Sequence, residues 1–265
     1  MRDPFFFTMF KTLPYPIIFA HRGASAHAPE NTLAAFELAV EQGADGIELD
    51  VKLTADGQVV VIHDPTVDRT TGAHGRVKDM SLAELRSLEA GSFFSAKFQS
   101  EKIPTLEEVF ESVGKRTFIN VELTNYKTPR DHLVESVCML VKKFGLQKRV
   151  LFSSFLPGNL ANARSYLPDV PTGLLALSGI LGLWPRSFGF AFGKYDALHP
   201  NLKNATQQQI YFVHRLKKRI HVWTVNSEAD LRRMFKWGVD AVFTDDPQLA
   251  VKVRGEKVED AIKPV

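Results

Sequence analysis

Short apolar runs alternate with longer amphipathic segments along most of the chain. The runs are rich in β-branched and aromatic residues, which is typical of buried strands. Eight are assigned as strands: Ile17–Ala20, Gly46–Val51, Thr117–Leu123, Val150–Ser153, Thr172–Leu175, Tyr195–His199, Ile220–Val225 and Ala241–Thr244. Between them, apolar residues recur at helical spacing, among other places in Asn31–Gln42, Leu106–Val113, Asp131–Phe144, Ala205–Lys217, Glu228–Trp237 and Pro247–Val253.

This alternation indicates the fold class. Eight strands that alternate with helices over about 250 residues predict an α/β fold of the parallel (β/α)8 TIM barrel type. A doubly wound open sheet is the alternative. At the first helix, we expect Asn31 to be the N-cap and Gly43 to take the left-handed position after the last turn.

One interval, between the second strand and Pro104, interrupts the alternation. It contains a predicted hairpin, in which Val51–Leu53 pairs with Val59–Ile62 around the turn Ala55-Asp56-Gly57. We therefore interpret residues 1–265 as a single barrel domain with an insertion at about 52–103. The insertion leaves from the C-terminal end of a strand, so we expect it to lie over the barrel mouth.

Composition narrows the class of protein. With 45% hydrophobic and 24% charged residues, the chain is a globular protein and not a disordered, collagen-like or disulfide-rich one. The 33 basic and 30 acidic residues are dispersed, which argues against a nucleic-acid partner. The lone Cys138 lies in an apolar helical run and is expected to be a buried thiol. Because the chain has no obvious secretory signal, we expect a cytoplasmic location.

Two apolar segments qualify that expectation, although neither has the ~18 uninterrupted apolar residues of a membrane span. One is Pro4–Phe10, and the other is Leu174–Gly193. Core packing, a dimer surface and contact with a lipid surface are all compatible with their composition. The last of these would make the protein peripheral to a membrane.

Polar residues on two neighbouring strands indicate chemistry inside the barrel. In Gly46–Val51 the residues alternate, so Glu48 and Asp50 face away from the aliphatic side that packs on the helices. The third predicted strand places Asn120 and Glu122 in the same way. Three inward carboxylates repel one another unless a cation or a shared proton relieves the repulsion.

An all-oxygen ligand set suits Mg²⁺ or Ca²⁺ better than a metal that prefers thiolates. The sequence thus predicts one divalent cation at Glu48, Asp50 and Glu122. The alternative is a salt-bridged core network in which Lys or Arg replaces the ion. We disfavour this network because neither residue type occupies a predicted inward position of these strands.

Two histidines end strands at the same barrel face. His21 follows the first strand, and His63 follows Val59–Ile62. Near neutral pH one imidazole can accept a proton while the other donates one. Arg22 offers a planar fork for an anion, although a surface ion pair is its alternative. A divalent cation, an arginine and an acid–base pair together suit a phosphate ester.

Two further residues lie at this face with less specific signals. Trp223 ends the seventh predicted strand and either lines the pocket or packs in the core. His199 ends the sixth, and its structural and substrate-binding interpretations are both open.

The motifs in their order along the chain resemble the glycerophosphodiester phosphodiesterase family over residues 17–253. They are His21-Arg22-Gly23, Pro29-Glu30-Asn31-Thr32, Glu48-Leu49-Asp50, Val61-Ile62-His63-Asp64, Asp68-Arg69-Thr70-Thr71-Gly72, Ile103-Pro104-Thr105-Leu106-Glu107-Glu108, Val222-Trp223-Thr224-Val225-Asn226 and Thr244-Asp245-Asp246-Pro247. The resemblance implies a barrel with a small insertion after the second strand.

The resemblance also implies functional roles. Glu48, Asp50 and Glu122 would be metal ligands, and His21 and His63 would be the acid–base pair, with metal contact as an alternative for His63. Arg22 would contact phosphate, and Trp223 would line the glycerol or alcohol side. One position departs from the family, which often has a phosphate-contacting lysine where Thr124 stands. The pocket would then hold one positive charge fewer.

The expected activity is metal-dependent hydrolysis of a small-molecule glycerophosphodiester to sn-glycerol 3-phosphate and an alcohol. The apolar Leu174–Gly193 segment leaves open a lysophospholipase D-type cleavage of lysophospholipids. A phospholipid-directed lyase that releases a cyclic phosphate is also compatible with these residues, and so is a non-catalytic binding barrel at a membrane surface.

Overall fold

The chain folds as a closed barrel of eight parallel strands in the computed structural model, which describes residues 13–262 and the side chains of residues 13–256. β1 (Ile17–His21) pairs with β2 (Gly46–Leu53) on one side and with β9 (Ala241–Thr244) on the other, which closes the ring. The order from β2 onward is β4 (Phe118–Leu123), β5 (Val150–Ser154), β6 (Thr172–Ala176), β7 (Ala197–Pro200) and β8 (Arg219–Val222). The predicted TIM barrel is confirmed, and the open-sheet alternative is wrong.

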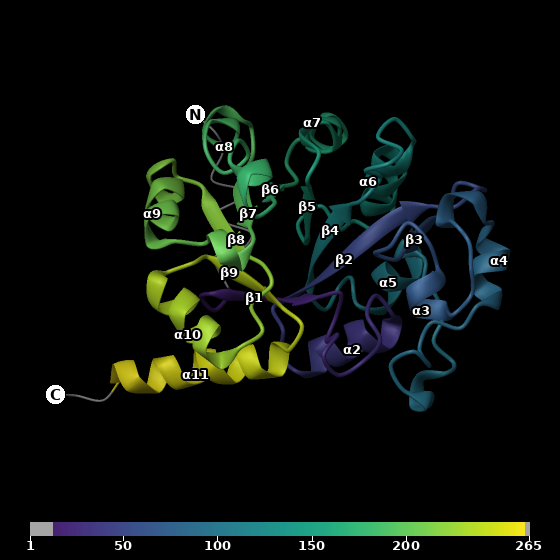
Figure 1. Ribbon diagram of the computed structural model, residues 1–265, viewed down its shortest axis with the longest axis horizontal. Coiled ribbons are helices and arrows are strands. Elements are labelled where there is room, and N and C mark those ends of the chain that lie inside the picture. The colour runs from purple at the N-terminus through teal and green to yellow at the C-terminus, as the bar shows by residue number, and fades with distance from the viewer. Residues whose placement is uncertain (1–12, 263–265) are drawn as a thin grey trace.

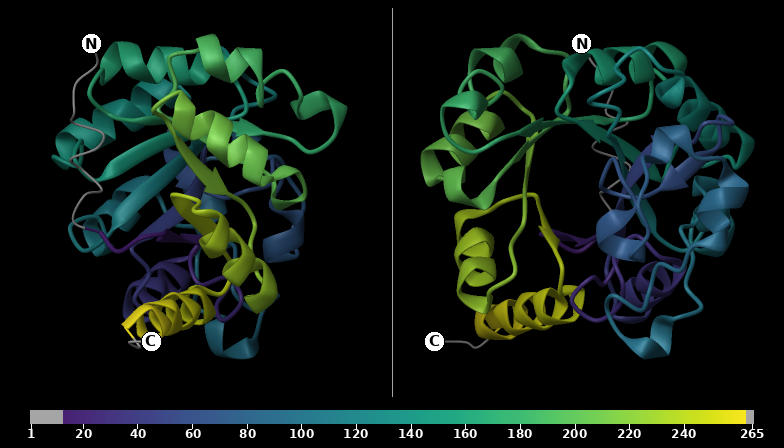
Figure 2. Two further views of the ribbon diagram at one scale, coloured as in Figure 1. Left: turned by 90° about the vertical axis from the view of Figure 1, so that its left-hand side faces the viewer. Right: turned by 45° about the vertical axis from the view of Figure 1, so that its right-hand side comes forward.

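Helices enclose the barrel from outside (Figures 1 and 2). They are α2 (Leu33–Glu41), α5 (Leu106–Ser112), α6 (Leu133–Lys143), α7 (Pro157–Tyr166), α8 (Phe188–Phe192), α9 (Gln207–Arg215), α10 (Glu228–Trp237) and α11 (Pro247–Ile262). Within the described residues, none of the helices has both the length and the apolar character needed to cross a membrane.

The main core lies between the outward faces of the strands and the helices. On β2, Ile47, Leu49 and Val51 are fully buried in it, as their alternation with polar residues predicts. The buried positions of α6 recur every three or four residues and include Cys138, whose exposure is 1%. The prediction of a buried helical thiol is therefore confirmed.

The start of α2 differs from the prediction. The N-cap is Thr32, whose hydroxyl accepts a hydrogen bond from the Ala35 amide at 3.3 Å. Asn31 is not the cap, because its side chain points the other way and donates to Asp50 Oδ2 at 3.0 Å. Gly43 does take the left-handed conformation, with φ at 80°. The residue predicted to be a local cap thus supports the inward face of β2.

The segment between β2 and α5, here called the β2–α5 segment, begins with the predicted hairpin. β3 (Val59–Val61) pairs antiparallel with the end of β2, with Val51 opposite Val61 and Leu53 opposite Val59. The segment continues through α3 (Asp68–Thr71) and α4 (Leu82–Ser87) and has a small apolar cluster of its own. It leaves from the C-terminal end of β2 and flanks the barrel beside α5 (Figure 1).

The two apolar segments have different outcomes. Pro4–Phe10 lies outside the described residues. In Leu174–Gly193, the strand residues of β6 and Phe190 are buried, but six large apolar side chains between β6 and β7 are more than half exposed. We call them the apolar loop cluster: Ile180, Leu181, Leu183, Trp184, Phe188 and Phe192, whose exposures range from 57% to 85%. Core packing is therefore wrong for these six.

Candidate active site

Three carboxylates meet inside the barrel at its C-terminal end. The register of the parallel pair β2–β4 places Asp50 directly opposite Glu122, and Glu48 opposite Asn120. One ligand oxygen from each of Glu48, Asp50 and Glu122 lies within 4.8 Å of the other two. Glu48 and Asp50 are buried, while Glu122 is partly exposed to the pocket. The alternation seen in the sequence therefore brings together the residues predicted to bind a metal.

The cluster is electrostatically strained without a cation. Burial raises the pKa of Glu48 well above its usual range, and repulsion from Asp50 and Glu122 raises it further. Burial and the Asp50 charge likewise raise the pKa of Glu122, although the Tyr126 hydroxyl donates to its Oε1 at 2.6 Å. A divalent cation among these oxygens would remove this repulsion, so the donor set fits a hard, oxygen-seeking ion.

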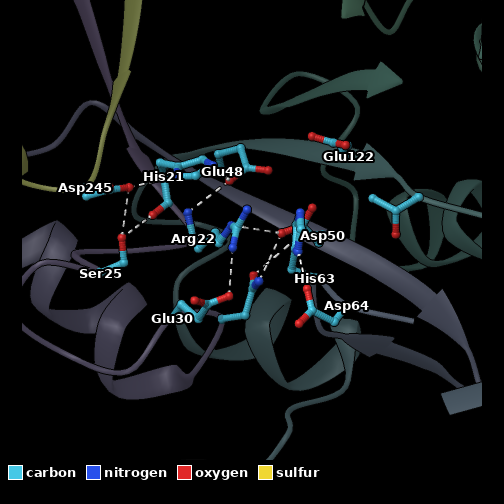
Figure 3. Close-up of polar contacts among 12 residues, drawn as sticks. His21, Arg22, Ser25, Glu30, Glu48, Asp50, His63, Asp64, Glu122 and Asp245 are labelled. Carbon is cyan, nitrogen blue, oxygen red and sulfur yellow. Dashed lines mark hydrogen bonds and ion pairs between the residues drawn. The ribbon is translucent and has the colours of Figure 1, made fainter. Parts of the chain in front are cut away.

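His21 ends β1 beside this cluster. Its Nε2 lies 4.0 Å from Glu48 Oε2, and its Nδ1 lies 2.7 Å from Asp245 Oδ1 (Figure 3). Asp245 follows β9, the strand that pairs with β1, so barrel closure brings together two residues from opposite ends of the chain. Burial opposes ionisation of Asp245, but contacts with His21, Asn226 and Ser25 outweigh it and lower the Asp245 pKa.

His63 is held in a comparable way. Its Nδ1 lies 2.6 Å from Asp64 Oδ1, and its side chain is 41% exposed. Burial would raise the pKa of Asp64, but hydrogen bonds from Arg69 and His63 outweigh burial and lower it to about 2. Each histidine thus has an ionised aspartate on one ring nitrogen and an open nitrogen on the other.

Arg22 lies between the two histidines in Figure 3. Its Nη1 donates to Glu30 Oε1 at 2.9 Å, and its Nε lies 3.6 Å from Asp50 Oδ2. Its backbone amide donates to Glu48 Oε2 at 2.9 Å, in a left-handed backbone conformation with φ at 57°. Arg22 therefore does form an ion pair, with Glu30, but this pair is partly buried and Arg22 also lines the pocket.

Lys52 lies at the edge of this site, against the expectation that the inward strand faces carry no cation. β2 extends to Leu53, so Lys52 shares the inward face of Glu48 and Asp50. Its Nζ donates to Thr124 Oγ1 at 2.7 Å. Burial lowers the pKa of Lys52, and the charges of Asp50 and Glu122 oppose this effect. An ammonium thus stands beside Thr124, where the sequence indicated a missing charge.

The pocket is lined by the carboxylates, the two histidines, Arg22 and a polar floor, and its volume is about 140 Å³. His199 is 1% exposed, and neither of its ring nitrogens has a hydrogen-bond partner among the described residues. Asn120 donates to Ser153 Oγ at 2.8 Å, which leaves its Oδ1 without a partner in that part of the chain. Trp223 lines one wall, with its Nε1 bound to the His199 carbonyl at 2.7 Å and its ring against Phe155.

All eight residues singled out from the sequence therefore line one pocket: His21, Arg22, Glu48, Asp50, His63, Glu122, His199 and Trp223. The residues that sequence reasoning missed are Lys52 and the two aspartates that hold the histidines. Asp64 and Asp245 both stand in motifs that were recognised, and their position next to a strand end was the available signal. For Lys52 the available signal was the alternation of inward and outward residues in β2, which continues from Glu48 and Asp50 to Lys52.

Comparison with known proteins agrees with this geometry. The model of the glycerophosphoryl diester phosphodiesterase family matches residues 21–249. A glycerophosphodiester phosphodiesterase of Caldanaerobacter subterraneus subsp. tengcongensis is 40% identical over 238 residues, which cover 89% of this chain and 97% of that protein. One from Bacillus altitudinis is 40% identical over 247 residues, with 90% and 98% covered.

A solved structure adds to this comparison. It is an Oleispira antarctica phosphodiesterase in complex with its product sn-glycerol-3-phosphate. It superposes with a TM-score of 0.84 at 32% identity and covers 92% of this chain and 98% of its own. With the family model spanning most of the barrel and relatives this similar, the chain belongs to the glycerophosphoryl diester phosphodiesterase family.

Proposed function

We propose that this protein hydrolyses glycerophosphodiesters to sn-glycerol 3-phosphate and an alcohol. The observation that carries the proposal is the pocket itself, in which two aspartate-held histidines flank three clustered carboxylates and an inward-pointing arginine. Such a set can neutralise a phosphate diester and also move a proton on each side of it. A single barrel domain with an insertion at about 52–103 remains our interpretation of the whole chain.

We propose that Glu48, Asp50 and Glu122 hold one divalent cation, Mg²⁺ or Ca²⁺. Its fit rests on the all-oxygen donor set and on the raised pKa values of two of the three carboxyl groups. When bound, such an ion polarises a phosphoryl oxygen as a Lewis acid. Arg22 and Lys52 would bind the remaining charge of the phosphate through their nitrogen donors.

The two histidines would divide the proton transfers. His21, on the enclosed side, would take the proton of the attacking hydroxyl. His63 is more exposed and borders the outside, so it would protonate the departing alkoxide. Asp245 and Asp64 would fix each ring so that the open nitrogen faces the substrate. The attacker can be water or the substrate's own glycerol hydroxyl, and product analysis distinguishes the two by a transient cyclic phosphate.

The pocket floor would receive the glycerol end. Buried polar atoms without partners are rare, and among the described residues His199 and Asn120 supply three of them in the lining of the pocket. A volume of about 140 Å³ would hold roughly four or five water molecules, so it has room for a small polyol. Glycerol hydroxyls would satisfy these atoms, with Trp223 against the carbon chain.

Replacing Asp245 by Asn should lower kcat by about 10²-fold, because an amide can hold the wrong tautomer of His21. KM should change less than threefold, since Asp245 does not contact the substrate in this mechanism. Steady-state kinetics on the full chain measure both. Asp246→Asn is the matched control and should retain most activity; equal losses in the two variants would point to local structure instead of His21 orientation.

The experiment that tests the function is a product assay with purified protein. Glycerol 3-phosphate and free alcohol are measured from glycerophosphocholine, glycerophosphoethanolamine and lysophosphatidylcholine, first with EDTA and then with Mg²⁺ or Ca²⁺ added back. We expect turnover of the glycerophosphodiesters that EDTA abolishes and one ion restores. Folded protein without turnover under any condition would overturn the proposal in favour of a binding barrel.

A lysophospholipase D-type reaction is the second candidate, and the apolar loop cluster favours it. These six exposed side chains follow β6 at its C-terminal end, which is the end that carries the reaction pocket. An acyl chain would bind there while the phosphate occupies the pocket, which corresponds to a peripheral location at a membrane. Turnover of lysophosphatidylcholine would support it, and hydrolysis of glycerophosphocholine alone would exclude it.

A further inference from the structure

A second cavity adjoins the reaction pocket on the side of His63. It measures about 440 Å³ and lies between the β2–α5 segment and the loop that joins β4 to α6. We call it the basic groove. Its lining includes Lys52, His63, Arg76, Lys78, Lys127 and Asp131.

The groove adjoins the reaction pocket at His63, which lines both cavities. Lys52 marks the border, because its stem lies on the inward face of β2 while its ammonium binds Thr124 on the groove side. The groove is therefore the neighbouring cavity on the His63 side of the pocket.

The lining of the groove carries more basic than acidic side chains. Four cations line it, from three separate parts of the chain: Lys52, Arg76, Lys78 and Lys127. Asp131 is the one carboxylate in the lining, and its two oxygens already accept hydrogen bonds from Asn125 at 2.7 Å and Thr128 at 2.6 Å.

Three of these cations have no ion pair within 4.0 Å in the part of the chain that the structure describes: Lys52, Arg76 and Lys127. Lys78 lies 3.5 Å from Asp79. The charges of Asp50 and Glu122 act on Lys52, whereas Arg76 and Lys127 lie farther from the carboxylate cluster on the groove side. Like charges gathered around one cavity repel one another, and an anion between them would relieve that repulsion.

We propose that the basic groove binds an anionic group on the alcohol that leaves the substrate. The inference rests on the proposed function and deepens it, since it names the substrate class as glycerophosphodiesters whose head group carries a further negative charge, such as a carboxylate. With the glycerol end against His199 and Asn120 and with His63 at the opening, the head group extends into the groove. Arg76 and Lys127 then pair with its anion.

The test compares two substrates that differ by one carboxylate, glycerophosphoserine and glycerophosphoethanolamine. The full chain should have a kcat/KM about twofold to fivefold higher for the serine diester, the effect of a partly exposed ion pair. Lys127→Gln and Arg76→Gln should each remove most of that preference and change kcat/KM for the ethanolamine diester less than twofold. Lys127→Glu should reverse the preference.

The matched control is Lys115→Gln, which removes a surface charge before β4, at the other end of the barrel. It should leave the ratio of the two substrates unchanged. Hydrolysis of both substrates at a ratio near one, or a ratio that the groove variants do not move, would overturn the groove proposal while the proposed function stands. Turnover of neither substrate by folded protein would overturn both.

Discussion

Replacing His21 by alanine should lower kcat by about 10³-fold while the affinity for the divalent cation stays within about threefold. In the proposed mechanism His21 moves a proton, so its loss removes general-base catalysis. Its Nε2 lies 4.0 Å from Glu48 Oε2, which is too far for a hydrogen bond that would position this metal-binding carboxylate. Glycerol 3-phosphate release gives kcat, and a cation titration followed by calorimetry gives the affinity.

The control for this variant is His74→Ala. His74 is a histidine of the β2–α5 segment whose side chain is 89% exposed and pairs with Asp68 at 2.9 Å. The His74→Ala variant should retain full activity. If His21→Ala loses cation binding in parallel with turnover, His21 is a metal ligand and the division of roles between the histidines is wrong. Partial recovery of activity with added imidazole would support a proton-transfer role.

The features of the site that follow the strand period were predictable from sequence. The alternation in β2 and β4 fixes which side chains point inward, and the parallel register then brings Asp50 opposite Glu122. His21 and His63 were predicted to share one pocket because each follows a strand, and the C-terminal strand ends meet at the barrel mouth. These inferences need only the local pattern and the fold class.

Other features depended on boundaries and long-range packing. Lys52 was missed because the barrel strand was expected to end at Val51, two residues before its end at Leu53, and a strand end cannot be placed that finely from composition. The pairing of His21 with Asp245 joins β1 to β9 and follows only from barrel closure. Asn31 was predicted to be a helix cap because its hydrogen bond to Asp50 is a tertiary contact, which the local sequence does not reveal. The apolar loop cluster has a core-like composition, and only the fold exposes it.

Replacing Glu122 by glutamine should have opposite effects on activity and on stability. The amide keeps an oxygen for the Tyr126 hydroxyl but removes one of three mutually repelling charges. Cation affinity should fall at least about 10²-fold, and kcat about 10³-fold. Without metal at pH 8, the free energy of unfolding should rise by about 1–2 kcal/mol. Urea unfolding in EDTA and product assays measure the two effects.

The stability gain of Glu122→Gln should depend on pH, because the wild-type carboxyl group titrates. Folding raises the pKa of Glu122, so the ionised carboxylate destabilises the native state, and stability is lost as pH rises from the unfolded pKa through the folded one. The gain in Glu122→Gln should therefore shrink as pH falls toward 5, where the wild-type group is protonated. Added Mg²⁺ or Ca²⁺ should stabilise the wild type more than the variant.

Glu107→Gln is the control for this comparison, because Glu107 lies on α5 outside the barrel and pairs with Lys143. It should leave activity and cation binding unchanged. A stability loss in Glu122→Gln at pH 8 in EDTA, with turnover preserved, would mean that the three carboxylates are balanced by Arg22 and Lys52 as a structural network. A stability gain with lost turnover would instead mean that the chain tolerates repulsion inside its barrel in order to hold a catalytic cation.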